Sequence, residues 1–158
     1  MSAEMNADAP LIVDAHLPRS GTRRRTGEVA AGILRREDGL LLLTSRPAGK
    51  AYAGYWELPG GKLEAGESVP QALARELHEE LGLTAAAEDV RPWRTLLADY
   101  PHTFVRLHFC FVTAWQGELH MHEGQHSTWA PLPIAVRPVL PATAPALRWL
   151  ASSEIPHE

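Results

Sequence analysis

The chain has 158 residues and a formal net charge of −4, a length that suits one domain with a buried core. The negative charge argues against a nucleic acid polymer as partner, and no apolar stretch is long enough to make a membrane an expected partner. The single cysteine, Cys110, excludes an internal disulfide and is expected to be a small buried residue. With no secretory signal visible at the start, the sequence indicates a cytoplasmic protein.

The beginning of the chain has no sustained hydrophobic period. Residues 1–27 are therefore predicted to be a flexible N-terminal tail, and residues 28–158 to form a single domain. Within the tail, Leu11–Val13 favour a short strand. The basic run Arg23–Arg25 is expected to be solvated rather than to contact phosphates.

Two strands and a loop are predicted next. Val29–Arg36 is strand-like and ends at Asp38-Gly39, a dipeptide typical of tight turns, and Leu40–Thr44 continues as a second strand. These two strands are expected to form a hairpin. Residues 46–55 predict a loop, and its aromatic residues together with the one that follows are expected to pack in the core rather than stack on a ligand: Tyr52, Tyr55 and Trp56.

A helix with defined ends is predicted after this loop. Ser68 can serve as N-cap, Gln71 completes a capping box, and Gly82 stands where a left-handed C-terminal residue is wanted. Apolar residues recur every four positions and predict a buried stripe: Leu73, Leu77 and Leu81.

The rest of the chain predicts three more strands and two helical segments. The expected strands are Val90–Asp99, interrupted near Pro92, Thr103–Trp115 and Ser127–Ala130, and the expected helical segments are Leu132–Val136 and Thr143–Leu150. Thr143 is the expected N-cap of the last helix. The combination of predicted strands and helices indicates an α/β fold in which helices cover the faces of a mixed sheet.

An acidic cluster on the central helix points to chemistry. Glu76, Glu79 and Glu80 are spaced as neighbours on one helical face, where like charges repel and need a counter-charge. Arg75 supplies one positive charge, and divalent cations can supply the rest. Carboxylate oxygens without patterned cysteines or histidines favour Mg²⁺, with Mn²⁺ as a substitute, over zinc. Glu67, just ahead of the helix, can join the same site. Taken alone, such a helix face is more typical of a solvated surface.

The wider segment from Gly61 to Leu83 resembles the signature of the Nudix hydrolases. That signature is Gly, five residues, Glu, seven residues, Arg-Glu, an apolar residue, any residue, Glu-Glu, any residue, Gly and an apolar residue, and every specified position is filled here. The resemblance implies a Nudix-type α/β/α sandwich with a mixed β-sheet and a loop-helix-loop catalytic segment. It also implies hydrolysis of a nucleoside diphosphate linked to another moiety.

The resemblance implies roles for individual residues. The metal ligands would be Glu76, Glu79 and Glu80, with Glu67 assisting and the Gly60 carbonyl as an additional ligand. Arg75 would hold Glu76 in place. The general base stays open among Glu76, Glu79 and Glu123.

Flanking segments are similar to the MutT-type branch, which cleans oxidised nucleotides such as 8-oxo-dGTP: Val29–Leu34, Ser45–Pro47 and Trp56–Lys62. This likeness implies release of a nucleoside monophosphate and pyrophosphate from a (d)NTP, with a small nucleotide as the binding partner of a monomer or homodimer. The expected substrate contacts are Arg46, Lys62, Leu58 and Thr143.

One departure affects the expected base specificity. Thr143 stands where that branch often carries an asparagine that reads the oxidised purine, and a hydroxyl cannot offer the paired donor and acceptor of an amide. CTP, another pyrimidine nucleotide or a nucleotide sugar is therefore an alternative substrate. A non-catalytic nucleotide-binding module is a further alternative, but it would be expected to lack ligand glutamates, and none is missing here.

Overall fold

The computed structural model describes residues 11–14, 26–100 and 103–152. Its strands are β1 (Leu11–Asp14), β2 (Thr26–Ile33), β3 (Leu41–Ser45), β4 (Trp56–Glu57), β5 (Gly60–Lys62), β6 (Val90–Asp99), β7 (Phe104–Val112) and β8 (Ser127–Ala130). The helices are α1 (Val69–Leu81) and α2 (Ala144–Ala151), and a 3₁₀ turn spans Ala87–Asp89.

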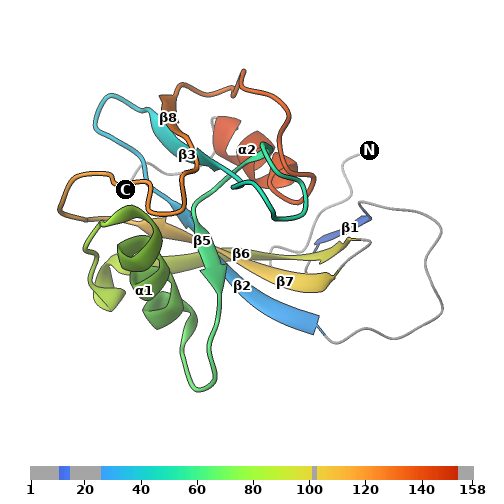
Figure 1. Ribbon diagram of the computed structural model, residues 1–158, viewed down its shortest axis with the longest axis horizontal. Coiled ribbons are helices and arrows are strands. Elements are labelled where there is room, and N and C mark those ends of the chain that lie inside the picture. Colours follow the sequence, from blue (N-terminus) through green and yellow to red (C-terminus); the bar gives the residue numbers. More distant parts are fainter. Residues whose placement is uncertain (1–10, 15–25, 101–102, 153–158) are drawn as a thin grey trace.

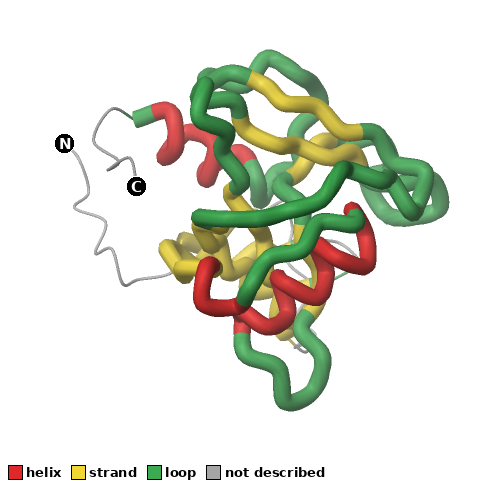
Figure 2. Tube along the Cα trace, turned by 90° about the vertical axis from the view of Figure 1, so that its left-hand side faces the viewer, coloured by secondary structure: helices red, strands yellow, loops and turns green. Residues whose placement is uncertain are grey.

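The strands form two sheets. The larger has the order β1-β6-β7-β2-β5 and is mixed, because β2 runs parallel to β7 whereas β6 and β7 are antiparallel. The smaller has the order β4-β3-β8. Helix α1 lies on one side of the larger sheet, and the smaller sheet and α2 lie on the other (Figure 1). The turned view in Figure 2 also places the two helices on opposite sides of the strands. The predicted α/β fold with a mixed sheet is confirmed.

Two apolar cores follow from the alternation of side chains along β7. Val105, Leu107 and Phe109 point into the core shared with the smaller sheet and α2. Cys110 and Val112 point into the core beneath α1. Cys110 is fully buried, as expected for a small apolar side chain.

Helix α1 has the ends that the sequence predicts. Gln71 N–H donates to the Ser68 hydroxyl and the Ser68 N–H donates to the Gln71 side chain, so the capping box is complete. Gly82 adopts the left-handed conformation at the C-terminal end, with φ of 71°. The leucine stripe is buried in the core below the helix: Leu73, Leu77 and Leu81. These caps fix where the acidic residues of the helix lie relative to the sheet.

The predicted hairpin is confirmed only next to its turn, where Arg35 pairs antiparallel with Leu41 and the Arg36 N–H donates to the Leu40 carbonyl at 2.8 Å. Its continuation along β2 and β3 is wrong, because the two strands belong to different sheets. The edge of β2 at Val29–Ala31 is taken by β5, whose two glycines allow a close approach. Strand β3 therefore diverges and pairs with β4 and β8.

The predicted helical segment at Leu132–Val136 is also wrong, because these residues form bends and extended chain. Pro131 and Pro133 explain the difference. Proline donates no backbone hydrogen bond, and it disfavours helical geometry in the residue before it, here Leu132.

The short strand expected near Leu11 is present as β1, which pairs in parallel with β6. Most of the predicted tail, including Arg23–Arg25, lies outside the described residues. Within the described part of the chain, no helix is both long enough and apolar enough to cross a membrane.

Candidate active site

A cleft of about 710 Å³ lies where α1, the two sheets and the loop before α2 meet. Carboxylates gather in it: Glu57, Glu76, Glu79, Glu80 and Glu123. Basic residues also line it: Arg46, Lys50 and Lys62. Other lining residues are apolar or aromatic, among them Val29, Tyr52, Leu58, Tyr100, Val105 and Leu140. The cleft thus offers charged groups for a metal and phosphates, and apolar groups for a less polar ligand part.

Most of the residues expected from the sequence line this cleft: Arg46, Leu58, Gly60, Lys62, Glu76, Glu79, Glu80, Glu123 and Thr143. Glu67 and Arg75 are not among the residues that line it. They lie beside the acidic face of α1 and contact it through hydrogen bonds.

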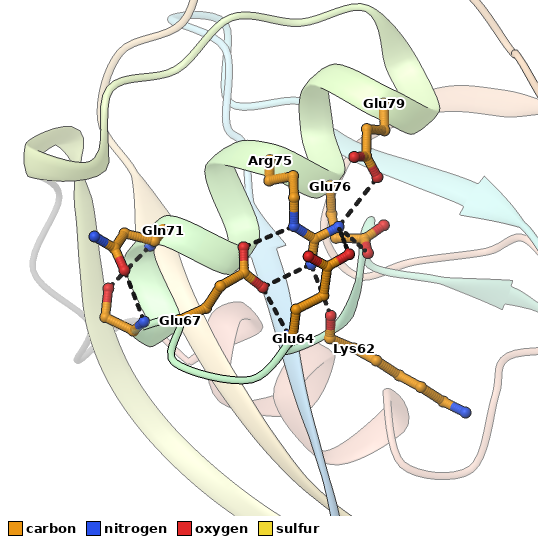
Figure 3. Close-up of polar contacts among 8 residues, drawn as sticks. Lys62, Glu64, Glu67, Gln71, Arg75, Glu76 and Glu79 are labelled. Carbon is orange, nitrogen blue, oxygen red and sulfur yellow. Dashed lines mark hydrogen bonds and ion pairs between the residues drawn. The ribbon is translucent and has the colours of Figure 1, made fainter.

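Arg75 lies at the centre of the hydrogen bonds that connect Glu67 to the acidic face of α1 (Figure 3). Its Nε and Nη2 donate to the two carboxylate oxygens of Glu67 at 2.7 and 2.8 Å. Its Nη1 donates to Glu76 at 2.9 Å and to Glu79 at 3.1 Å, and Nη2 also donates to the Lys62 carbonyl at 2.9 Å. One guanidinium therefore orients two cleft glutamates and ties the helix to the end of β5, which its forked, planar geometry allows.

Glu67 is hydrogen-bonded to Arg75 and is not among the residues that line the cleft. Its side chain is 17% exposed, and it also accepts a bond from the Glu64 backbone N–H at 2.7 Å. The hydrogen bonds from Arg75, with that of Glu64 next, lower the pKa of Glu67 to about 2. Glu67 is therefore ionised at neutral pH and compensates Arg75 in this structure.

The backbone of β5 approaches Glu76 closely. An added Cβ at Gly61 would lie 2.4 Å from the Glu76 carboxyl carbon, far inside ordinary contact. Gly61 pairs with Ala30 of β2, which fixes its position in the sheet. A glycine is needed here so that the Glu76 carboxylate can lie over the strand.

Negative charge in the cleft is only partly compensated. Burial raises the pKa of Glu80 to about 8, and the charges of Glu76, Glu123 and Glu57 add to the rise. A divalent cation would relieve this repulsion, and the donors are the hard oxygens that Mg²⁺ and Mn²⁺ prefer. The donor chemistry fits such a cation, although no three acidic, histidine or cysteine side chains converge as a preformed site in the described part of the chain.

Glu57 and Arg46 form an ion pair inside the cleft that the sequence reasoning did not foresee. Arg46 Nη1 donates to both Glu57 oxygens at 3.2 and 3.4 Å, and its Nε donates to the Ala51 carbonyl at 2.7 Å. Burial raises the pKa of Glu57, and the Arg46 charge opposes the rise. The contact follows from the pairing of β4 with β3, which places Glu57 opposite Thr44. The sequence does not indicate which strands pair, so it could not predict this ion pair.

A weak ion pair connects Glu123 to the loop after β3. Lys50 Nζ lies 3.9 Å from Glu123 Oε1, and both side chains are half exposed. The backbone around Glu123 is anchored more firmly, because its N–H donates to the Gln125 side chain and the His126 N–H donates to the Ser45 hydroxyl. The Glu123 backbone is therefore held by a hydrogen bond, whereas its exposed carboxylate makes a weak ion pair.

Thr143 precedes α2 as expected, but its hydroxyl makes no capping hydrogen bond. The side chain is 2% exposed and lines the cleft. The adjacent Ala142 N–H donates to the Tyr100 hydroxyl at 2.9 Å, which ties this segment to the end of β6. The expected capping contact is wrong because Thr143 itself has helical backbone angles, with φ of −82° and ψ of −31°, instead of the extended angles of a capping residue.

The aromatic residues of the 46–55 loop and β4 divide between core and cleft. Tyr55 and Trp56 pack against the core, as expected. Tyr52 also contacts that core, but it lines the cleft as well.

Comparison with known proteins gives a family match over most of the chain. The model of the NUDIX domain matches residues 25–150. The chain is 41% identical over 102 residues to the 8-oxo-dGTP diphosphatase of Haemophilus influenzae, a match that covers 65% of this chain and 74% of that protein. It is 40% identical over 121 residues to the CTP pyrophosphohydrolase of Escherichia coli, which covers 76% and 87% of the two chains.

A solved structure is also similar. The MutT structure described for Aliivibrio salmonicida and Vibrio cholerae is matched with a TM-score of 0.64 and 32% identity, over 80% of this chain and 98% of that one. The matches in sequence and in structure both extend well beyond the signature segment.

Proposed function

The chain belongs to the Nudix family and is a MutT-like nucleotide pyrophosphohydrolase, and we propose that it uses Mg²⁺ to hydrolyse a nucleoside triphosphate to the monophosphate and pyrophosphate. Nudix hydrolases are generally dependent on divalent metals, and we propose Mn²⁺ as the substitute. The observation that carries the proposal is a cleft in which the glutamates of α1 face basic residues and an apolar region.

We propose 8-oxo-dGTP as the first substrate to test, which would give the protein a role in DNA repair through nucleotide sanitation. This rests on the relatives from Haemophilus influenzae and Escherichia coli that carry that activity in their names. CTP is the second candidate, because the relative of that name matches a longer part of this chain. Thr143 supports retaining both 8-oxo-dGTP and CTP as candidate substrates. It lines the cleft with a single hydroxyl, which lacks the separate donor and acceptor groups of an asparagine amide.

The proposed metal ligands are the glutamates of the helix together with nearby groups: Glu76, Glu79, Glu80, Glu67 and the Gly60 carbonyl. Bound divalent cations neutralise charge on the phosphates and lower the pKa of bound water. Arg75 would keep the Glu76 and Glu79 carboxylates turned toward the phosphates, because its Nη1 bonds to both.

The chain's basic side chains would hold the polyphosphate. Arg46 uses Nε and Nη1 for Ala51 and Glu57, which leaves donors on Nη2 for an anion. Lys62 lies at the edge of the cleft, and its ammonium points away from Arg75 (Figure 3). Leu58, buried at the cleft wall, would contact the less polar part of the nucleotide.

Glu123 is the best of the three candidate general bases. Glu76 and Glu79 both accept hydrogen bonds from Arg75, so each has a carboxylate oxygen that is already engaged. Among the described residues, the Glu123 carboxylate has one ion-pair partner, Lys50 at 3.9 Å, so we propose that it turns and accepts a proton from an attacking water.

A substrate panel with product identification tests the proposal. Purified protein should release pyrophosphate from 8-oxo-dGTP or CTP with Mg²⁺ and lose this activity with a chelator. Glu80→Gln should lower kcat by about 10³-fold without unfolding, because an amide cannot supply the anionic oxygen that is proposed to bind the cation. Glu88→Gln, at an exposed glutamate in the 3₁₀ turn, is the matched control and should leave kcat unchanged. Absence of turnover for every nucleotide in the panel would refute the proposal.

We also propose that residues 28–158 form one catalytic domain preceded by a tail, a division supported by the extent of the family match. The proposed setting is the cytoplasm, with a monomer or homodimer acting on small nucleotides rather than on nucleic acid polymers or membranes. Light scattering of the purified chain tests the oligomeric state.

A further inference from the structure

The C-terminal end of α1 is completed by a loop that is distant in sequence. An α-helix leaves its last four backbone carbonyls without partners inside the helix. In α1 the first of these, that of His78, accepts a bond at 3.0 Å from the N–H of Gly82, directly after the helix. The other three accept bonds from the loop between β7 and β8: Glu79, Glu80 and Leu81. This loop therefore holds the end of the helix on which two of the proposed metal ligands lie.

Three hydrogen bonds make the connection. The His120 N–H donates to the Leu81 carbonyl at 2.9 Å. The His122 N–H donates to the Glu80 carbonyl at 3.2 Å and is shared with the His120 carbonyl at 3.0 Å. The shortest bond comes from a side chain, since the Nδ1 of His122 lies 2.7 Å from the Glu79 carbonyl oxygen. A carbonyl oxygen can only accept, so this contact requires a proton on Nδ1.

Glu123 follows His122 directly, in a turn that is held on both sides. The turn spans residues 121–124, is closed by a backbone bond of 3.1 Å between its ends, and has His122 and Glu123 at its centre. Beyond it, the Ser45 N–H donates to the His126 carbonyl and the His126 N–H donates to the Ser45 hydroxyl, both at 2.9 Å. Glu123 therefore lies between a contact with the end of α1 and a contact with β3.

The contact with α1 determines how Glu123 lies relative to the acidic helix face. The carboxylates of Glu79, Glu80 and Glu123 all line the same cleft. His122 joins them, because its ring bonds to the backbone of Glu79 and its own backbone continues into Glu123. The imidazole is not among the residues that line the cleft, so an effect of His122 on a bound nucleotide has to pass through its neighbours.

We propose that His122 is a positioning residue, which sets Glu123 against the acidic face of α1 through its bond to the Glu79 carbonyl. The inference rests on the proposed function, in which Glu123 accepts the proton of the attacking water. A general base has to lie within hydrogen-bond reach of that proton, and the phosphates are expected beside the glutamates of α1. His122 thus links the backbone that carries the base to the backbone that carries the phosphate-binding groups.

Steady-state kinetics of variants at His122 test the inference, with Mg²⁺ and the nucleotide that the wild type hydrolyses fastest. His122→Leu removes the donor, whereas His122→Asn keeps one, because the asparagine amide nitrogen is bonded to Cγ as Nδ1 is in histidine. His122→Leu should lower kcat by about tenfold and change KM by less than about twofold, since a small displacement of a catalytic group lowers the rate steeply. His122→Asn should restore kcat to within about threefold of the wild type.

His126→Leu is the matched control. It makes the same change in the same loop, at a histidine whose backbone makes the contact with Ser45 and whose side chain does not line the cleft. It should leave kcat and KM unchanged. A His122 ring that only caps the helix would give a His122→Leu protein with a lower melting temperature and an unchanged kcat, and this result overturns the inference.

A double-mutant cycle shows whether His122 acts through Glu123. Glu123→Gln removes the base and should lower kcat by about 10²-fold or more. In that background His122→Leu should have no further effect, because there is no base left to position. An equal loss from His122→Leu in both backgrounds, or an unchanged kcat in Glu123→Gln, overturns the inference while the proposed function stands. A wild type that hydrolyses no nucleotide overturns the proposed function itself.

Nitrogen-15 NMR of the histidine rings covers the case in which His122→Leu does not fold. The chain has eight histidines, and the resonances of His122 are those that disappear in His122→Asn. The wild-type ring should carry a proton on Nδ1, as the bond to the Glu79 carbonyl requires. A ring with its proton on Nε2 alone overturns the inference.

Discussion

Replacing Gly61 by alanine should separate catalysis from folding. The added Cβ would lie 2.4 Å from the carboxyl carbon of Glu76 and 2.5 and 2.7 Å from its oxygens. Ordinary contact begins near 3.4 Å, so the carboxylate must retreat by about 1 Å. A shift of this size in a positioned catalytic group costs about 10²-fold in rate, or about 2.7 kcal/mol of barrier.

The fold should survive this change, because the obstacle is the end of a side chain and alanine has less backbone entropy to lose than glycine. The assay is pyrophosphate release, with kcat and KM measured beside the melting temperature. Gly39→Ala is the control, since its Cβ meets nothing within 4 Å but its φ of +87° is unfavourable for alanine. It should lower stability by about 1 kcal/mol and leave kcat unchanged. If Gly61→Ala folds and keeps kcat/KM within about threefold of the wild type, the inferred crowding of Glu76 is refuted.

Two further predictions concern ionisable groups. The pKa of Glu80 rises from 4.5 to about 8 on folding, first through burial and then through the charges of Glu76 and Glu123. The folded state therefore holds this proton more tightly, and without metal the free energy of unfolding should fall as pH rises from about 4.5 to about 8. Thermal melts in chelator should show this fall, and Mg²⁺ or Glu80→Gln should reduce it; a fall of equal size in all three samples contradicts the prediction. Cys110 is fully buried, and burial raises the pKa of its thiol to about 12. It should resist a thiol reagent such as dithionitrobenzoate until denaturant is added, and rapid labelling of the native protein would be inconsistent with the structure.

The sequence predicts those parts of the molecule whose causes are local. The ends of α1 follow from Ser68, Gln71 and Gly82, because capping involves residues within one turn of the helix. The acidic face of α1 follows from helical spacing in the same way. Predictions that depended on which strands pair with each other were less successful. The hairpin extends no further than the bridge beside its turn, because β5, more than 25 residues after the start of β2 along the chain, pairs with the edge of β2.

For the candidate site as well, the sequence identifies residues within one local segment but not those brought in by distant contacts. Glu76, Glu79 and Glu80 can be named from the signature segment alone. Glu57, Lys50 and Tyr52 enter the cleft through strand pairing and loop bracing, which depend on contacts distant in sequence. The Thr143 hydroxyl shows a further limit, because its position at a helix start predicts a cap that its backbone angles do not allow.

The acidic wall of the cleft is assembled from β4, α1 and the loop before β8, which carry Glu57, Glu80 and Glu123. The proposed ligands on α1 meet the Gly60 carbonyl of β5 only when the helix is packed on the larger sheet, so tight binding of a cation requires the folded state. A cation that binds the folded state and not the unfolded one raises the free energy of unfolding in proportion to the logarithm of its concentration. Cellular divalent-metal supply would therefore govern how long this chain survives proteolysis as well as how fast it turns over.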